Sequence, residues 1–237
     1  MNMEALAITD HGVMYGAIEF YKKAKKAGIK PIIGCEVYIS ENSMHDKRPN
    51  IDDKRYHLIL LAKNNAGYKN LIKIVSAAHL EGFYYKPRID KDFLRKHSEG
   101  LIALSACLGG ELSRAIASKN YDKAKKIALE HEEIFGKGNY YIELQQHPHI
   151  EDQNLVTPQL VKLAKDTGIP MVATQDSNYT HADDAHAHDV LLAVQTGNKL
   201  DDTDRLSMKE DNFSLLTGQD MYEKFKSLCE DVAIEAI

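Results

Sequence analysis

The chain has 237 residues, 43% hydrophobic and 27% charged, with a formal net charge of −5. This is the composition of an ordinary globular domain, long enough for one α/β core. The negative net charge argues against an extended basic surface that binds nucleic acid through its phosphates, but it allows a local pocket for one phosphate. The apolar runs are too short to span a membrane, nothing resembles a signal peptide, and the three cysteines are too scattered for a disulfide framework. We therefore expect a cytoplasmic protein.

Apolar runs and amphipathic segments alternate along the chain. In chain order the patterns predict a strand over 5–10, a helix over 15–27, a strand over 31–39, a polar loop over 41–54, a strand over 57–62, a helix from about 65, an aromatic and basic loop over 82–89, a helix over 90–97, a strand over 101–105, helices over 109–118 and 121–135, a strand over 140–144, a helix over 154–167, a strand over 170–174 and a helix over 184–195. Such alternation predicts an α/β fold with a mostly parallel sheet.

Side chains able to bind a metal stand where several predicted strands end. A β/α barrel builds its active site from the carboxyl ends of its strands. Alternate strand residues face opposite sides, so Cys35 and Glu36 cannot face the same cavity. Glu36 shares the facing of Gly34 and is the better ligand, whereas Cys35 is expected to pack outward. The predicted strand-end groups are His11, Glu36, Cys107, Glu143 and Asp176.

This mixture of imidazole, carboxylate and thiolate suits Zn²⁺, with Mn²⁺ or Fe²⁺ as alternatives. Metal-assisted phosphoester hydrolysis is the chemistry that these residue types predict. His57 stands at a strand start and is by spacing alone a weaker candidate. For His57, Cys107 or Glu143 taken singly, a structural role in the core is the alternative.

Six segments also carry a resemblance to a known family. They are AITDHG over 7–12, KPIIGCEVY over 30–38, HLILLAKN over 57–64, FYYKPRI over 83–89, SACLGGE over 105–111 and AHDVLL over 187–192. Together they resemble the polymerase-and-histidinol-phosphatase (PHP) domain of bacterial DNA polymerase III alpha subunits over nearly the whole chain. The FYYKPRI segment makes the resemblance specific to the polymerase branch.

The resemblance implies a distorted seven-stranded β/α barrel that holds up to three metal ions, Zn or Mn, and can run a metal-dependent 3′→5′ exonuclease. In other members of the family the ligands are lost, and the domain becomes a scaffold that helps to bind a separate proofreading exonuclease. The family's metal-ligand positions fall on His11, Glu36, His57, Cys107 and Asp176. This match raises His57 above its rank from spacing.

Several further residues are expected to lie around the metal ligands or at the rim of the site, from their sequence positions and from the resemblance. Lys86 and Arg88 are expected at the rim, where a basic pair could steady a DNA phosphate, with a plain solvated loop as the alternative. His147 and His149 are expected to be rim residues, and His181 or His186 could compensate for a missing ligand. Possible supporting residues around the metal are Asp10, Glu143, Asn178 and His188.

Two departures from the family pattern predict an impaired site with few ions or none. The family opens with a strand bearing His-x-His and an acidic ligand, and no such segment precedes Met1, so we expect a barrel lacking its first strand. The last motif, Asp-x-His in the family, reads Asp176-Ser177-Asn178 here. An amide oxygen is a weak neutral ligand for Zn²⁺.

We expect residues 1–200 to form the PHP domain and 201–237 a connection toward a polymerase palm domain, without a polymerase active site in the chain itself. The leading hypothesis is an impaired metal-dependent phosphoesterase or 3′→5′ exonuclease site within a DNA-directed DNA polymerase, a nucleotidyltransferase of DNA replication. The alternative is a non-catalytic domain that stabilises the polymerase, and a free small-molecule phosphatase ranks third. The implied partners are a DNA 3′ end, the remainder of the alpha subunit, a proofreading exonuclease subunit and the sliding clamp, with no membrane.

Overall fold

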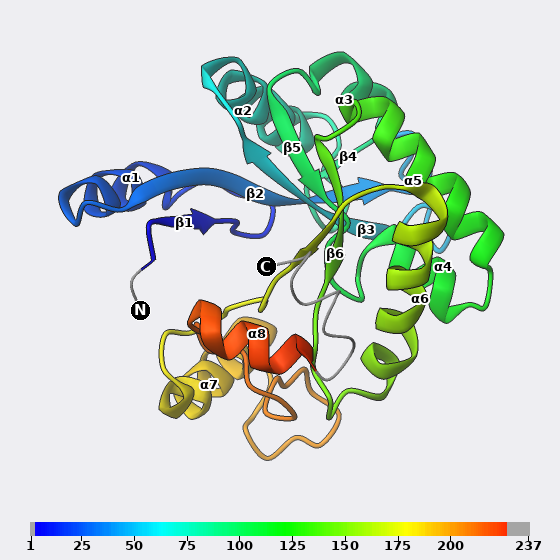
Figure 1. The fold of residues 1–237 in the computed structure, drawn as a ribbon. Helices are drawn as coiled ribbons and strands as arrows, with labels where there is room; N and C mark the ends of the chain where they lie inside the picture. The colour runs from blue at the N-terminus through cyan, green and yellow to red at the C-terminus, as the bar shows by residue number, and fades with distance from the viewer. Residues whose placement is uncertain (1–2, 227–237) are drawn as a thin grey trace.

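The computed structural model describes residues 3–226, so Cys229 and the end of the expected 201–237 connection lie outside the described residues. One curled sheet occupies the centre, and helices surround it (Figure 1). The strands are β1 (Ala5–Ile8), β2 (Lys30–Ser40), β3 (Arg55–Ala62), β4 (Arg88–Ile89), β5 (Leu101–Leu104), β6 (Tyr140–Leu144) and β7 (Met171–Ala173). The helices are α1 (Ala17–Lys26), α2 (Asn65–Leu80), α3 (Lys91–His97), α4 (Glu111–Ala117), α5 (Tyr121–Phe135), α6 (Glu151–Thr167), the short 3₁₀ helix η1 (Ala182–Asp184), α7 (Ala185–Thr196) and α8 (Gly218–Lys226). The predicted α/β class is confirmed.

The sheet has the order β1-β2-β3-β5-β6-β7, and β4 pairs with β2. The β1–β2, β2–β4, β5–β6 and β6–β7 pairs are parallel, whereas β3 is antiparallel to both β2 and β5. Within residues 3–226 no ladder joins β1 to β7, so the sheet is a curled half-barrel that is open between these two edges. Because β3 runs backwards, its first residues lie at the end of the sheet where its neighbours finish.

The antiparallel direction of β3 follows from the loop over 41–54, which returns the chain beside β2 instead of crossing the sheet by a helix. Seven residue pairs, from Gly34 with Leu61 to Ser40 with Arg55, form the β2–β3 ladder. Parallel neighbours need a longer crossover connection, which the other units supply with helices.

The apolar core lies between the sheet and the helices α2 to α6. In α2, Leu71 and Ile74 are fully buried on one helix face against Leu60 of β3. This packing is close enough that a Cβ on Gly67 would lie 1.8 Å from the backbone oxygen of Gly100. Asn64 caps the same helix, since its Oδ1 accepts a hydrogen bond from the Gly67 amide at 3.0 Å.

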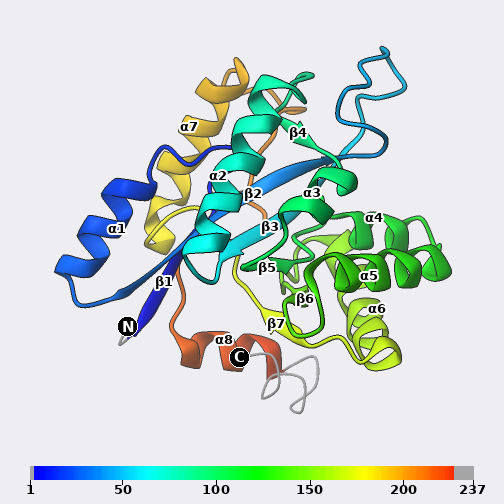
Figure 2. The same cartoon turned by 90° about the horizontal axis from the view of Figure 1, so that it is seen from above.

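The C-terminal part returns toward the open side of the sheet, where α7 and α8 lie near the edge strands (Figures 1 and 2). The segment over 205–209 is fastened to α7 through Asp189, which is 1% exposed. Arg205 binds both carboxylate oxygens of Asp189 at 2.6 and 2.7 Å, Ser207 donates to it at 2.9 Å, and Lys209 lies 2.5 Å away. Among the described residues no helix is long and apolar enough to cross a membrane.

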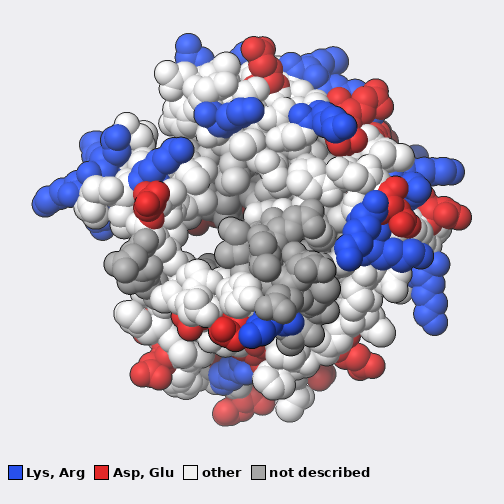
Figure 3. Space-filling model, in the orientation of Figure 1, with Lys and Arg blue, Asp and Glu red and all other residues white. Residues whose placement is uncertain are grey.

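Charged side chains of both signs lie mainly around the periphery of the face drawn in Figure 3. The middle of this face, beside the residues drawn in grey, is hollowed and mostly uncharged.

Candidate metal centre

Three side chains from neighbouring strands converge at one end of the sheet. His11 follows β1, Glu36 lies in β2, and His57 lies in β3. His11 Nε2 is 3.3 Å and His57 Nδ1 is 2.5 Å from Glu36 Oε1. The ligand atoms of all three lie within 4.8 Å of one another, and no other group of this kind occurs in the part of the chain that the structure describes.

The strand pairings place these side chains together. The parallel β1–β2 register continues to a bridge between His11 and Glu36, with the Glu36 amide donating to the Asp10 carbonyl at 3.0 Å. In the antiparallel β2–β3 ladder Tyr38 is paired with His57. Glu36 lies two residues from Tyr38, so Glu36 and His57 occupy the same face of the sheet as diagonal neighbours.

The intervening Cys35 points to the other face. It is fully buried in the apolar core, and its Sγ–H donates to the Asp10 carbonyl at 3.3 Å. Burial raises the pKa of this thiol to about 12. Cys35 is therefore a packing residue, whereas Glu36 faces the two imidazoles.

Among the described residues, the buried Glu36 carboxylate is compensated by the two histidines. Glu36 is 5% exposed. Burial by itself would raise the pKa of Glu36, but the close contacts with His11 and His57 and their charges outweigh burial and lower the pKa to about 2. The same contact with Glu36 raises the pKa of His11 against the opposing effect of burial.

The donor set fits a divalent cation. Although Glu36 Oε1 is close to both rings, it makes no hydrogen bond of acceptable geometry within the described residues. Two imidazole nitrogens therefore converge on a carboxylate oxygen that no hydrogen bond of good geometry satisfies. Zn²⁺ and Mn²⁺ take such ligands.

Cys107 and Asp176 lie beside this group without joining its compact cluster. Cys107 Sγ is 3.6 Å from His57 Nδ1 and accepts a hydrogen bond from the Gly109 amide at 3.4 Å. Burial raises the pKa of the Cys107 thiol. Burial, followed by the charge of Glu36, raises the pKa of Asp176 to about 6.

The backbone at both positions is strained. Ala106, immediately before Cys107, has φ 63°, and Asp176 has φ 54°. The left-handed region is costly for alanine and is only somewhat better tolerated by aspartate. Strain of this kind persists where the surrounding structure fixes a functional loop.

The four expected supporting residues have different surroundings. The exposed Asp10 contributes its backbone carbonyl, and His188 lies near Tyr179 with ring centroids 5.4 Å apart. Glu143 is 5% exposed and accepts a hydrogen bond from Thr174 Oγ1 at 2.5 Å, and burial raises its pKa to about 7. Asn178 is exposed and donates to the Asp176 carbonyl at 2.8 Å. Supporting roles at the metal stay predictions for all four.

The expectation for Arg88 as a DNA-contacting rim residue is wrong. Its side chain is fully buried, and its guanidinium donates to the carbonyls of Gly82, Met44, Asp46 and Asp52. Arg88 thus ties the loop over 41–54 to the loop over 82–88. By contrast Lys86 is exposed, lies 5.9 Å above the Tyr38 ring and faces the same cavity as His11.

Of the two histidines expected at the rim, His149 is exposed but His147 is not. His147 is 1% exposed and stacks on Phe213, with ring centroids 4.2 Å apart. His181 is exposed, and its backbone amide donates a hydrogen bond to the Asp184 carboxylate at 3.0 Å. This bond caps η1. His186 is exposed on α7. Tyr38 and Phe213 could not be predicted as part of this region, because Tyr38 stands in an apolar run that looks like core and Phe213 stands alone in a polar segment.

The fold is an open α/β half-barrel in which imidazole and carboxylate groups that could hold a metal ion gather at one end of the sheet. A family model described as the PHP domain matches residues 1–147. The chain therefore belongs to the PHP domain family, as the resemblance of its motifs indicated.

Relatives named DNA polymerase III subunit alpha match almost the whole chain. The one from Borreliella burgdorferi is 48% identical over 230 residues, covering 97% of this chain and 20% of the relative. Those from Treponema pallidum and Thermus aquaticus are 42% and 46% identical, covering 95% and 92% of this chain but 19% and 18% of their own lengths. The chain thus spans about a fifth of the length of the curated relatives it matches.

Proposed function

We propose that this chain is the PHP domain of a replicative DNA polymerase alpha chain and that its His11–Glu36–His57 cluster is a metal-dependent phosphoesterase site acting at a DNA 3′ end, with reduced activity. The observation that carries the proposal is the convergence of three ligand atoms within 4.8 Å, beside a cavity large enough for a nucleotide. The names of the matched relatives support the polymerase context.

Each side chain has a distinct task in this proposal. Glu36 supplies the negative charge, and the two imidazoles supply neutral nitrogen ligands when deprotonated. A bound divalent ion would polarise a phosphoryl oxygen and lower the pKa of a coordinated water. Lys86, on the exposed loop at the cavity mouth, would pair with the phosphate as a point charge.

Reduced activity follows from the small number of side chains that can bind a metal at this site. Only three ligand atoms converge within the described residues, and Asn178 stands where the family has histidine. Its amide nitrogen is bonded to the Asp176 carbonyl, and its oxygen is a weak neutral ligand. We infer one Zn²⁺ or Mn²⁺ in place of the family's three.

A second candidate is a structural domain that stabilises the polymerase and presents an interface to a proofreading subunit or to the rest of the chain. The observation in its favour is the apolar surface near α1, where Tyr15 is 86% and Ile18 is 58% exposed. A contiguous exposed apolar patch is typical of a surface that binds another protein or domain. This role and the metal site are compatible within one domain.

Metal content and hydrolysis of labelled single-stranded DNA test the proposal together. The protein, dialysed against Zn²⁺ or Mn²⁺, should retain about one ion per chain and release mononucleotides from the 3′ end. Glu36→Gln should lose the ion and the hydrolysis, whereas Glu19→Gln, at an exposed position on α1, should change neither.

The outcomes separate the two candidates. An ion lost on Glu36→Gln without any hydrolysis would support the structural candidate with a residual metal site. No stoichiometric ion in the unmodified protein would refute the metal centre itself. Hydrolysis that survives Glu36→Gln would place the chemistry elsewhere.

A further inference from the structure

A cavity of about 640 Å³ opens directly from the candidate metal centre. Its lining includes His11, His57 and Cys107, together with Lys86 and Tyr38. The lining also includes six apolar side chains: Leu108, Ile150, Leu192, Leu206, Met208 and Phe213. A phosphate requires only the polar part of this lining, so the apolar part indicates a ligand with an apolar, uncharged part.

The lining also carries neutral hydrogen-bonding groups. These are the amides and hydroxyls of Gln145, Gln153, Gln195, Thr196 and Ser207. Amides and hydroxyls both donate and accept, and together they can match the mixed donors and acceptors on the edge of a heterocycle. Lys86, Asp176 and Glu210 are the charged groups of the lining, apart from histidines.

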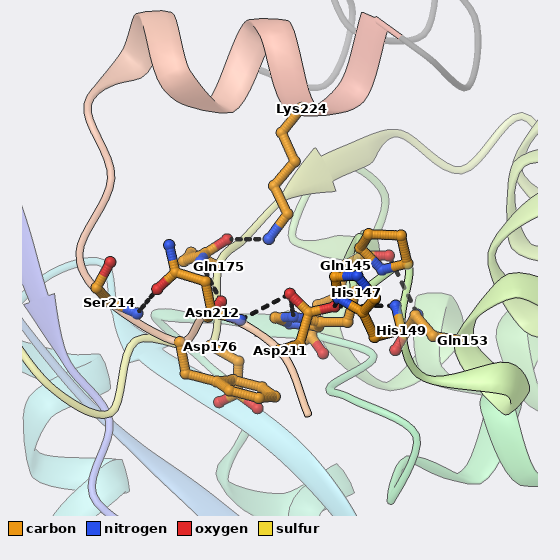
Figure 4. A network of polar contacts seen from close by, with 12 residues as sticks. Gln145, His147, His149, Gln153, Gln175, Asp176, Asp211, Asn212, Ser214 and Lys224 are labelled. Atoms are coloured by element: carbon orange, nitrogen blue, oxygen red, sulfur yellow. Dashed lines mark hydrogen bonds and ion pairs between the residues drawn. The ribbon is translucent and has the colours of Figure 1, made fainter. Parts of the chain in front are cut away.

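His147 is a buried polar residue of the cavity lining that has no hydrogen-bond partner among the described residues. Neither of its ring nitrogens is bonded, and its contact with Asp211 is 3.7 Å, longer than a hydrogen bond (Figure 4). Burial, followed by the charge of Lys224, lowers the pKa of His147 to about 4, so its ring is neutral with one donor and one acceptor. Buried polar groups are normally satisfied, which makes this ring a position where a ligand could supply the partner.

The wall of the cavity is fixed in place rather than loosely packed. Leu206, Ser207 and Met208 lie on the segment that Arg205, Ser207 and Lys209 fasten to Asp189 of α7. On the opposite wall Gln153 donates to the Gln145 carbonyl at 3.1 Å. A preorganised pocket loses less free energy on ordering when a ligand binds.

We propose that this cavity holds the base of the terminal nucleotide, unstacked from its strand, while the phosphate of that nucleotide lies at the metal centre. The inference rests on the proposed function and deepens it by naming the binding site for the base. Its volume lies within the range of small-ligand sites. Apolar walls, aromatic rings and neutral amides are also the groups with which proteins hold an unstacked base.

Binding of two single-stranded oligothymidylates tests this inference. One ends in an ordinary nucleotide and the other in an abasic residue, and each has a phosphorothioate as its last linkage to slow hydrolysis. Fluorescence anisotropy of a label at the 5′ end gives the two affinities in the presence of Mn²⁺. We expect the ordinary end to bind about tenfold more tightly, the scale of one base stacking contact.

A variant that fills the cavity provides the second arm. Met208→Trp, at a half-buried position of the wall, should remove the advantage of the ordinary end and leave the affinity of the abasic end unchanged. Leu155→Trp, at a 63% exposed position on α6, is the matched control and should change neither affinity.

The results distinguish this inference from the proposed function. Equal affinities for the two ends, with 3′ hydrolysis present, would overturn the base site alone. An advantage of the ordinary end that survives Met208→Trp would place the base outside this cavity and likewise overturn the site. Failure to bind either oligonucleotide would overturn both the base site and the proposed function.

Discussion

Replacing Arg88 tests whether this residue is a structural anchor. Its guanidinium donates to four backbone carbonyls from two loops, and the bonds to Asp52 and Asp46 are the shortest at 2.5 and 2.8 Å. A hydrogen bond from a charged donor contributes about 1.5–3 kcal/mol. Arg88→Met removes all four bonds, and loss of the two shortest alone should lower the free energy of unfolding by about 3–6 kcal/mol.

Urea denaturation measures this change through the transition midpoint at constant slope. Arg88→Lys should recover only part of the loss, because an ammonium group cannot reach four carbonyls in a fixed plane. Lys86→Met, on the exposed part of the same loop, is the control and should change stability by less than about 0.5 kcal/mol. Trypsin should also cut the freed loop faster in Arg88→Met, at exposed Lys47.

A loss below about 1 kcal/mol in Arg88→Met would refute this reasoning. So would unchanged stability combined with weaker DNA binding, since that pattern belongs to a solvent-exposed phosphate contact. The two interpretations therefore give opposite results in two independent assays.

Two further substitutions are predicted from the packing and the electrostatics. Gly67→Ala should destabilise the protein by more than about 2 kcal/mol in urea denaturation even though alanine is the better helix former, because the new Cβ would lie 1.8 Å from a facing carbonyl oxygen. Gly218→Ala, where the Cβ meets nothing within 4 Å, should not destabilise it, and equal effects of the two changes would contradict the packing argument. Burial, followed by the charge of a nearby lysine, lowers the pKa of His131 from 6.5 to about 4. As the pH falls, the unfolded chain therefore binds a proton at this residue before the folded protein does. The free energy of unfolding should fall by about 3 kcal/mol between pH 6.5 and pH 4. His131→Phe should remove that part of the pH dependence in denaturation midpoints, and exposed His186→Gln should not; an unchanged slope in His131→Phe would show that the ring is already charged or hydrated.

Much of the fold could be predicted from the sequence, because each apolar run and each amphipathic stretch is local. The helix over 121–135 and the strand over 140–144 have the same bounds in the structure as in the prediction. The opposite facing of Cys35 and Glu36 follows from the strand period alone, and the structure places them on opposite faces. Periodicity is a property of neighbouring residues, which explains this agreement.

The direction of β3 could not be predicted in this way. His57 ranked low by spacing because it stands at a strand start, and a start lies far from the site in a fully parallel sheet. The structure reverses β3, so its start pairs with the last residues of β2 and His57 lies near Glu36. Strand direction depends on which partner the strand finds, and the hydrophobic pattern is the same in both directions.

Burial of polar groups could not be predicted either. Arg88 lies in a loop with exposed aromatic residues, and His147 lies beside a proline, so both positions looked solvent-exposed. Arg88 is buried because carbonyls from two distant loops converge on it, and His147 because Phe213 covers its ring. Such long-range partners leave no periodic signal in the sequence.

The position of His11 just after the edge strand β1 would link metal occupancy to association between molecules. Among the described residues β1 pairs only with β2, over four residues, and the bridge from His11 to Glu36 extends that contact (Figure 2). An ion shared by His11, Glu36 and His57 would fasten this edge to the interior of the sheet, and its binding free energy would add to the cost of opening β1. Chelation would then free an unpaired strand edge, which is a template for pairing with another chain. Amide exchange in β1 that is unaffected by a chelator would show that the ion does not fasten this edge.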